Sequence, residues 1–191
     1  MKGWNSSGST PWGAYCGKIK RIVIEDGVTS IGDWAFSNCS KLTSVAIPDG
    51  ITSIGKCAFD RCSKLSSVTL PDGLISIGQY AFSETELLLS ITIPRSVTSL
   101  GYRAFGPTFT DYQPTDITVG WTENIPEWNN FTKDTHQSGI TLHVPCGTEE
   151  LYQAADGWKD YTIEGEGGPY TITVESDDPN MGTVDAIKID N

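Results

Sequence analysis

The chain has 191 residues and 38% hydrophobic side chains, a size and composition typical of one large or two small folded domains. No segment approaches the roughly 18 consecutive apolar residues of a membrane-spanning helix. Residues 1–105 carry 10 Lys and Arg against 8 Asp and Glu, whereas residues 106–191 carry 3 against 16. The acidic residues 106–191 would repel the phosphate backbone of a nucleic acid, so we expect no nucleic-acid partner. Their charge is also typical of a surface that keeps a protein soluble.

Residues 1–21 are predicted to be a degenerate N-terminal cap or half repeat. The segment from Cys16 to Ile22 aligns with the later segment from Cys39 to Val45 but lacks the preceding half of the unit. Trp12 and Tyr15 lie just before Cys16, at the positions where a complete unit would have that preceding half. The polar first eleven residues have no apolar stretch or cleavage site, so no export signal is expected within the chain.

Residues 22–105 contain four copies of one 23-residue unit. The repeated columns are Ile24, Ile47, Leu70 and Ile93; Gly32, Gly55, Gly78 and Gly101; and the pairs Ala35-Phe36, Ala58-Phe59, Ala81-Phe82 and Ala104-Phe105. A constant period of this length is typical of a solenoid, in which each coil packs only on its neighbours.

The pattern inside one unit predicts a short strand, a turn and a compact return segment. Val45 and Ile47 are two positions apart and therefore point to the same face of a strand, while Ala46 points outward. Pro48 ends the strand because proline has no N–H for the ladder. We expect a helical turn or a short helix around Ala58-Phe59.

Cysteine spacing predicts buried thiols and excludes a complete disulfide framework. Cys16, Cys39 and Cys62 share one column with Thr85, as expected for small side chains that fill one slot of each coil. No C-x-x-C pair is present, so no metal site is expected. Cys57 shares a column with Trp34, Tyr80 and Arg103 that we expect to be exposed, and Cys146 falls in a turn.

Residues 106–164 are predicted to be degenerate repeats followed by a capping helix. The steps from Ile93 to Val119 and from Val119 to Val144 both exceed the regular period, so these residues belong to longer coils. In these coils Trp121, Trp128 and Phe131 replace the Ala-Phe pairs. Thr148 is the expected N-cap of a helix that ends at Gly157. Its expected apolar face closes the open end of the stack and consists of Leu151, Ala154, Ala155 and Trp158.

Residues 165–191 are predicted to be a linker and the start of an incomplete β module. The Gly-rich segment 165–169 has linker composition, and the alternation of Tyr170, Ile172 and Val174 predicts a strand. About 22 residues are too few for an independent domain.

The stretch Ile31-Gly32-Asp33-Trp34-Ala35-Phe36-Ser37-Asn38-Cys39-Ser40-Lys41-Leu42-Thr43-Ser44-Val45-Ala46-Ile47-Pro48 strongly resembles the BspA-like leucine-rich-repeat family. The resemblance covers residues 19–105 and continues more weakly to about residue 161. It implies a right-handed α/β solenoid with short parallel strands on the concave face and short helical or irregular convex segments. It also implies secreted or surface proteins of bacteria that act as adhesins without catalysis. Residues 170–186 are similar to the first strands of an internalin-type B repeat.

Catalytic chemistry has little support in the sequence. No nucleophile elbow, zinc-binding helix motif or phosphate-binding loop is present. His136 and His143 lie outside the regular repeats, and His143 falls at an outward strand position where a surface role is expected. The acidic run 177–180 fits a turn between strands better than a calcium site. We therefore expect no enzyme activity and no cofactor.

The outward strand positions form the expected ligand-binding concave face. They are Arg21, Val23, Ser44, Ala46, Ser67, Thr69, Ser90 and Thr92. These small, mostly hydroxyl-bearing side chains can bind an extended polypeptide or glycan through many weak hydrogen bonds, and they equally suit tight strand stacking. The candidate aromatic anchors, of the kind that dominates binding hot spots, are Trp34, Tyr80, Tyr102, Trp121 and Trp128.

Two hypotheses of function follow. The first is a non-catalytic interaction module of a bacterial cell-surface or secreted protein, which mediates adhesion by binding a host matrix protein or a protein on another cell. The alternative is a carbohydrate-binding or spacer segment of a larger cell-wall-associated enzyme. Both place the chain outside the cell. The open N-terminal end leaves a dimer as one option.

Overall fold

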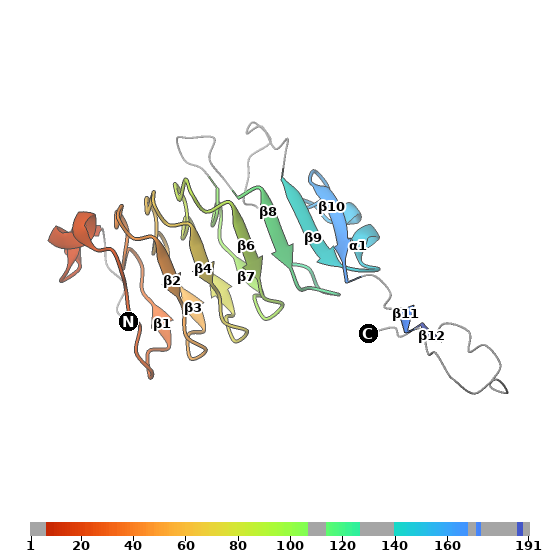
Figure 1. The fold of residues 1–191 in the computed structure, drawn as a ribbon, viewed down its shortest axis with the longest axis horizontal. Helices are drawn as coiled ribbons and strands as arrows, with labels where there is room; N and C mark the ends of the chain where they lie inside the picture. Colours follow the sequence, from red (N-terminus) through yellow and green to blue (C-terminus); the bar gives the residue numbers. More distant parts are fainter. Residues whose placement is uncertain (1–6, 107–113, 127–139, 168–170, 173–186, 189–191) are drawn as a thin grey trace, which may run out of the picture.

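The computed structural model describes residues 7–106, 114–126, 140–167, 171–172 and 187–188 of the chain. Figure 1 shows a solenoid of parallel strands, with successive coils stacked along the long axis of the molecule. This arrangement confirms the predicted repeat architecture. The predicted domain boundaries remain predictions.

One flank of the solenoid is a continuous parallel sheet that the sequence pattern does not predict. Its two-residue strands are β1 (Ser30–Ile31), β3 (Ser53–Ile54), β5 (Ser76–Ile77) and β7 (Ser99–Leu100). Each strand pairs without offset, Ser30 with Ser53 and Ile31 with Ile54. Strands this short contain no alternation that a sequence pattern can reveal.

The other flank contains the predicted strands of the concave face and one further strand, β10. They are β2 (Ser44–Ala46), β4 (Ser67–Thr69), β6 (Ser90–Ile93), β8 (Asp116–Val119), β9 (Thr141–Pro145) and β10 (Thr162–Glu166). β2 pairs with β4, and a separate sheet has the order β10-β9-β8-β6. We use the name concave face for the outward side chains of these strands and of residues 21–23.

The concave-face sheet is interrupted between β4 and β6. Within the described chain these two strands belong to different sheets, although they lie on successive coils. Residues 20–24 likewise form no strand against β2. An open pocket of about 470 Å³ is lined by residues of both segments. The coils at both interruptions are therefore joined mainly by the opposite flank and by the convex turns.

The convex segments are ladders of tight turns rather than short helices, which is the irregular form of the two that were predicted. The Phe36 amide donates to the Ala58 carbonyl oxygen (2.8 Å), and the Phe59 amide donates to that of Ala81 (2.7 Å). These bonds run between coils, whereas a helix bonds within its own segment. Left-handed residues make the turns possible: in the second unit, Cys57 and Arg61 have φ values of 53° and 58°. Neither position holds a glycine, which would have indicated such a turn.

The core of the coils contains one stack of aromatic rings. Phe36, Phe59, Phe82 and Phe105 follow one another with ring centroids 5.2–5.4 Å apart. Trp12 extends the stack with a centroid distance of 5.6 Å to Phe36, and its Nε1 donates to the Ala35 carbonyl oxygen (2.6 Å). Trp12 lies between the 3-10 helices Ser7–Ser9 and Gly13–Lys18.

The cysteine column is buried as predicted, but the expected exposure of Cys57 is wrong. Cys16, Cys39 and Cys62 are at most 4% exposed. Burial raises the pKa of the Cys62 thiol to about 12 and that of Cys57 to about 11, so both stay protonated and unreactive. Cys57 is 3% exposed, whereas Trp34, Tyr80 and Arg103, which share its left-handed backbone, are half-buried.

The C-terminal coils differ in three ways from the prediction. The helix is shorter, α1 (Glu149–Ala154), and the Thr148 hydroxyl makes no capping bond but donates to the Pro145 carbonyl oxygen (2.6 Å). The buried residues are Tyr152 and Trp158, while Leu151 is 42% exposed. The chain then adds β10, for which no strand was predicted. The predicted apolar face is confirmed at Ala155 and Trp158 and wrong at Leu151 and Ala154, which are exposed, because Tyr152 faces the core instead.

Only short parts of the C-terminal segment are described. β11 (Thr171–Ile172) pairs in antiparallel fashion with β12 (Ile187–Lys188). β11 lies within the predicted strand 170–174. Residues 173–186, which carry most of the similarity to an internalin-type B repeat and the acidic run 177–180, lie outside the described residues.

Glycine is required where successive coils touch. A Cβ atom at Gly78 would lie 2.6 Å from the Gly55 carbonyl carbon and from the Lys56 amide nitrogen, and one at Gly55 would lie 2.5 Å from the Asp33 amide nitrogen. Both contacts are shorter than any real Cβ contact, and the obstacle is backbone.

We predict that Gly78→Ala lowers the free energy of unfolding by at least about 1–3 kcal/mol, because the coils must separate to admit the methyl group. The control is Gly17→Ala, whose Cβ would have no neighbour within 4 Å and which should change stability by less than about 0.5 kcal/mol. Urea denaturation followed by circular dichroism measures both. Equal midpoints for the two variants would contradict the close approach.

A buried carboxylate lies in the convex ladder. Asp60 is 8% exposed, and burial raises its pKa from 3.8 to about 6. Arg61, whose Nε lies 4.0 Å from the carboxylate, lowers this pKa, and Glu84 raises it. Between about pH 4 and 6 the folded chain therefore binds more protons at this group than the unfolded chain, so this group reduces stability as pH rises.

We predict that Asp60→Asn increases the stability at pH 7 by about 1–3 kcal/mol, since the difference between the folded and unfolded pKa corresponds to about 3 kcal/mol at most. The gain over the wild type should shrink toward pH 4. Urea midpoints of both proteins, compared between pH 4 and 7, test this. A gain that is constant with pH would show that packing rather than titration is responsible.

Candidate functional site

All eight residues predicted for the concave face are exposed. Val23 is 68% exposed, and the outward positions of β2, β4 and β6 alternate with buried or half-buried neighbours such as Val45 and Ile91. The structure thus places Arg21, Val23, Ser44, Ala46, Ser67, Thr69, Ser90 and Thr92 on one accessible surface. Their part in binding stays a prediction.

Strand register continues this surface onto the irregular coils. Thr92 of β6 pairs with Thr118 of β8, which pairs with His143 of β9, which pairs with Glu164 of β10. Side chains in the same register position lie on the same face of a sheet. The row of small hydroxyl side chains therefore leads to a histidine and then to an acid.

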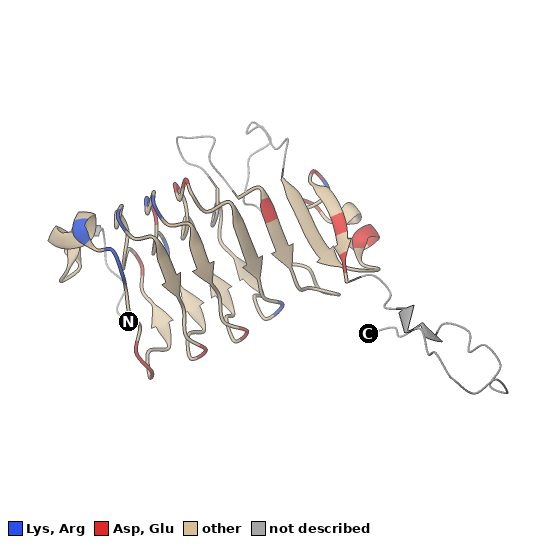
Figure 2. Cartoon of the chain, viewed as in Figure 1, with Lys and Arg blue, Asp and Glu red and all other residues tan. Residues whose placement is uncertain are grey.

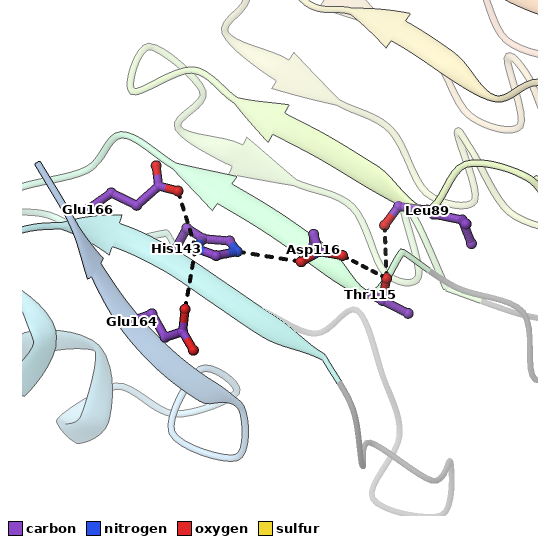
Figure 3. A network of polar contacts seen from close by, with 6 residues as sticks. All are labelled: Leu89, Thr115, Asp116, His143, Glu164 and Glu166. Carbon is purple, nitrogen blue, oxygen red and sulfur yellow. Dashed lines mark hydrogen bonds and ion pairs between the residues drawn. The ribbon is translucent and has the colours of Figure 1, made fainter.

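His143 lies among three carboxylates (Figure 3). Its Nε2 atom is 3.5 Å from Oδ1 of Asp116, and its Nδ1 atom is 3.2 Å from Oε1 of Glu166 and 3.9 Å from Oε2 of Glu164. The imidazole is 20% exposed, whereas each carboxylate is more than half exposed. A neutral imidazole carries one N–H, so only the protonated ring donates on both sides.

A hydroxyl group holds one of these carboxylates in place. Thr115 Oγ1 donates to Oδ2 of Asp116 (2.8 Å) and lies 3.3 Å from the Leu89 carbonyl oxygen of the preceding coil. Oδ1 of Asp116 is left to face His143. The arrangement fixes the acid beside the ring through contacts from two coils.

An open cavity of about 290 Å³ lies beside this cluster, at the interruption between β4 and β6. Its polar lining side chains are Ser66, Ser67, Ser90, Thr92, Asp116, Thr118, His143 and Glu166. Carboxylate and hydroxyl oxygens accept hydrogen bonds, so the cavity suits an ammonium or guanidinium group of a ligand. We call the cavity together with His143, Asp116, Glu164 and Glu166 the acidic pocket.

The acidic pocket does not have the geometry of a metal centre. The carboxylates contact opposite nitrogen atoms of the imidazole, so no single point is close to all of them. In the described part of the chain, no group of three or more His, Cys, Asp or Glu side chains is arranged to hold a metal ion.

Sequence reasoning identified His143 as an outward strand residue but missed its three partners. The reason is the changing coil length: Ser90 pairs with Asp116 across a coil longer than the regular period, but Thr141 pairs with Thr162 across a shorter one. One signal was present, because Ile163 alternates with Glu164 and Glu166 as in a strand with one exposed face.

The predicted aromatic anchor Trp121 is wrong, because this side chain belongs to the core. It is 4% exposed, its Nε1 donates to the Val97 carbonyl oxygen (2.8 Å), and its ring contacts Trp158 edge-on at 5.6 Å. The Tyr152 hydroxyl donates to the Trp121 carbonyl oxygen (2.8 Å). Ile93 pairs with Val119, so Trp121 follows its strand as Arg95 does, and its indole contacts the Val97 backbone rather than the column of the Ala-Phe pairs.

The other candidate anchors contribute less aromatic surface than expected. Trp34 and Tyr80 are half-buried, and Tyr102 is 38% exposed. Tyr102 contacts Tyr80 edge-on at 5.7 Å and lies under the Arg103 guanidinium at 5.3 Å. Trp128, like His136, lies outside the described residues.

The chain is similar to known repeat proteins. A family model described as "BspA type Leucine rich repeat region" matches residues 14–115 in six copies. The crystal structure of pneumococcal vaccine antigen PcpA matches 75% of this chain and 40% of that chain, with a TM-score of 0.56 and 17% identity. The likeness to PcpA supports the solenoid fold, and the chain spans less than half of the length of that antigen.

Two further solved structures are each 23% identical to the chain. A leucine-rich repeat protein from Bacteroides ovatus ATCC 8483 has a TM-score of 0.36 over 67% of this chain and 41% of that chain. The T. pallidum leucine-rich repeat protein has a TM-score of 0.39 over 76% of this chain and 83% of that chain. No curated protein matches the sequence. Among the described helices, none is long and apolar enough to cross a membrane.

We predict that Trp121→Ala lowers the free energy of unfolding by about 3–5 kcal/mol, as expected when a buried aromatic side chain is removed. Tyr102→Ala, on the half-exposed convex surface, should cost about 1 kcal/mol or less. Urea denaturation compares them. An equal loss of unfolding free energy in the two variants would contradict the burial of Trp121 and would make it a candidate anchor again.

Proposed function

The chain belongs to the BspA-type leucine-rich repeat family, and from this premise we propose that it is a non-catalytic protein-binding module of a cell-surface or secreted bacterial protein. The family is typical of bacterial surface proteins and of protein interaction, and its solenoids are non-catalytic folds. Beyond what family membership implies, the concave face binds an extended segment of a partner protein, and the acidic pocket receives a cationic side chain of that segment.

The polar row of β6, β8, β9 and β10 that leads into the acidic pocket carries this proposal. Outward residues of β4 and β6 offer hydroxyl groups, and Asp116 and Glu166 offer negative charge at the end of the row. An extended peptide presents hydrogen-bonding groups along its whole length, so it can use such a row.

The partner has to supply the large anchors. The concave face carries no tryptophan or tyrosine at its eight predicted positions, yet aromatic and arginine side chains dominate most binding hot spots. The acidic pocket complements an arginine or lysine side chain, since carboxylates pair with guanidinium and ammonium groups. A partner with basic residues in an extended segment therefore fits better than an acidic one.

The position outside the cell and the adhesive role are parts of the same proposal. Residues 106–191 carry 3 basic against 16 acidic side chains, which suits a surface exposed to solvent. Host matrix proteins, or proteins on another cell, are the partners that such a module would meet.

We predict saturable binding of the folded chain to at least one protein in a panel of immobilised extracellular-matrix proteins. Asp116→Asn combined with Glu166→Gln should weaken that binding tenfold or more, which corresponds to about 1.4 kcal/mol. Surface plasmon resonance at physiological salt measures the affinities.

The matched control removes the same number of charges elsewhere. Asp26→Asn combined with Asp49→Asn alters exposed turns that do not line the acidic pocket, and it should change affinity by less than threefold. Absence of saturable binding across the panel would count against adhesion through this chain. Equal losses in the two double variants would count against the acidic pocket as the binding site.

A further inference from the structure

The exposed charges of the regular coils are separated onto two edges. Lysines stand in the turns before β2 and β4, and aspartates stand in the turns after them, so Figure 2 shows blue at one edge of these coils and red at the other. We call Lys18, Lys41 and Lys64 the basic edge and Asp26, Asp49 and Asp72 the acidic edge. Each set repeats with the regular period of the coils.

The basic edge has a regular spacing that the fold imposes. Ser44 pairs with Ser67 without offset, and Lys41 and Lys64 each precede their strand by the same number of residues. They are therefore about one strand spacing apart, roughly 4.8 Å at the backbone. Lys18 continues the series at the end of the 3-10 helix Gly13–Lys18, with Lys20 and Arg21 beside it.

The lysines of the basic edge have no acidic partner within the described residues. The acids near other basic residues are engaged elsewhere, since Asp60 pairs with Arg61 and Asp156 pairs with Lys159. All three lysines of the edge are exposed. Like charges this close lie within the Debye length of about 8 Å at physiological salt, so they repel one another until an anion neutralises them.

We propose that the basic edge binds a linear sulfated polysaccharide that runs along the solenoid axis. This surface is separate from the concave face and does not depend on the function proposed for it. The acidic edge repels a polyanion and so leaves the basic edge as its place of binding.

Charge spacing favours this ligand over two other polyanions. Side chains on one face of an extended acidic peptide are about 6.6–6.8 Å apart, and the phosphates of one DNA strand advance about 3.4 Å along the axis. A linear polysaccharide can carry sulfate groups on successive rings, so it can present one anion to each coil.

The footprint is short because the fourth coil breaks the pattern. Leu87, 52% exposed, occupies the position of the lysine, and Glu86 precedes it. In the same coil Arg95 replaces the aspartate of the acidic edge. The site therefore covers the first three coils and takes a short anionic stretch.

Immobilised heparin, a linear sulfated polysaccharide, is the probe. The full chain should bind it with an affinity that falls as salt rises, because binding releases counterions. The combined variant Lys18→Gln, Lys41→Gln and Lys64→Gln should bind at least tenfold more weakly, with a smaller dependence on salt. These exposed positions should leave the circular dichroism spectrum and the unfolding midpoint unchanged.

The matched control changes the net charge equally without touching the basic edge. Lys56→Gln, Arg95→Gln and Lys159→Gln, all at exposed positions, should change the affinity by less than threefold. The same limit should hold for Asp116→Asn with Glu166→Gln, which separates this proposal from the one for the concave face.

Three results would overturn the proposal. They are absence of salt-dependent binding to heparin, equal losses in the two triple variants, and binding of polyglutamate or duplex DNA as tight as that of heparin.

Discussion

The structure depends above all on close backbone contact between successive coils. At Gly55, Gly78 and Gly101 the chain of one coil lies so near the next that no side chain fits between them. This contact sets the coil spacing on one flank, where β1, β3, β5 and β7 pair without offset. Once the offset is zero, every position of a unit stacks on its copies. The phenylalanine stack, the buried cysteines and the charged edges all follow from that single condition.

The acidic pocket lies where this regularity ends. The regular coils present small side chains on the concave face, and such side chains give little specificity by themselves. After residue 106 the coil length changes, and Asp116, His143, Glu164 and Glu166 come together from three neighbouring strands. Insertions in a repeat are tolerated where they leave the strand pairing intact, as β8, β9 and β10 do. An irregular coil can therefore carry individual chemistry without loss of the stack.

Much of the fold was predictable from the sequence because repetition makes the buried columns visible. The buried state of Cys39, Phe59 and their copies, and the outward direction of Ser44 and Ala46, followed from the period alone. The convex turns were not predictable, because they place Trp, Cys, Tyr and Arg in a left-handed conformation that usually indicates glycine or asparagine. The acidic pocket was not predictable either, since its residues meet across one coil that is longer and one that is shorter than the regular period.

The interruption between β4 and β6 has a mechanical consequence. On the opposite flank β3, β5 and β7 are joined by continuous hydrogen-bonded pairing, so that side resists extension along the solenoid axis. On the concave face β2 pairs with β4 but β4 and β6 are not paired, so that side is more compliant at this step. Under load, the spacing of these coils therefore changes more easily on the concave face than on the opposite flank, and the solenoid bends. The curvature of this solenoid is thus least constrained beside the cavity that His143 lines.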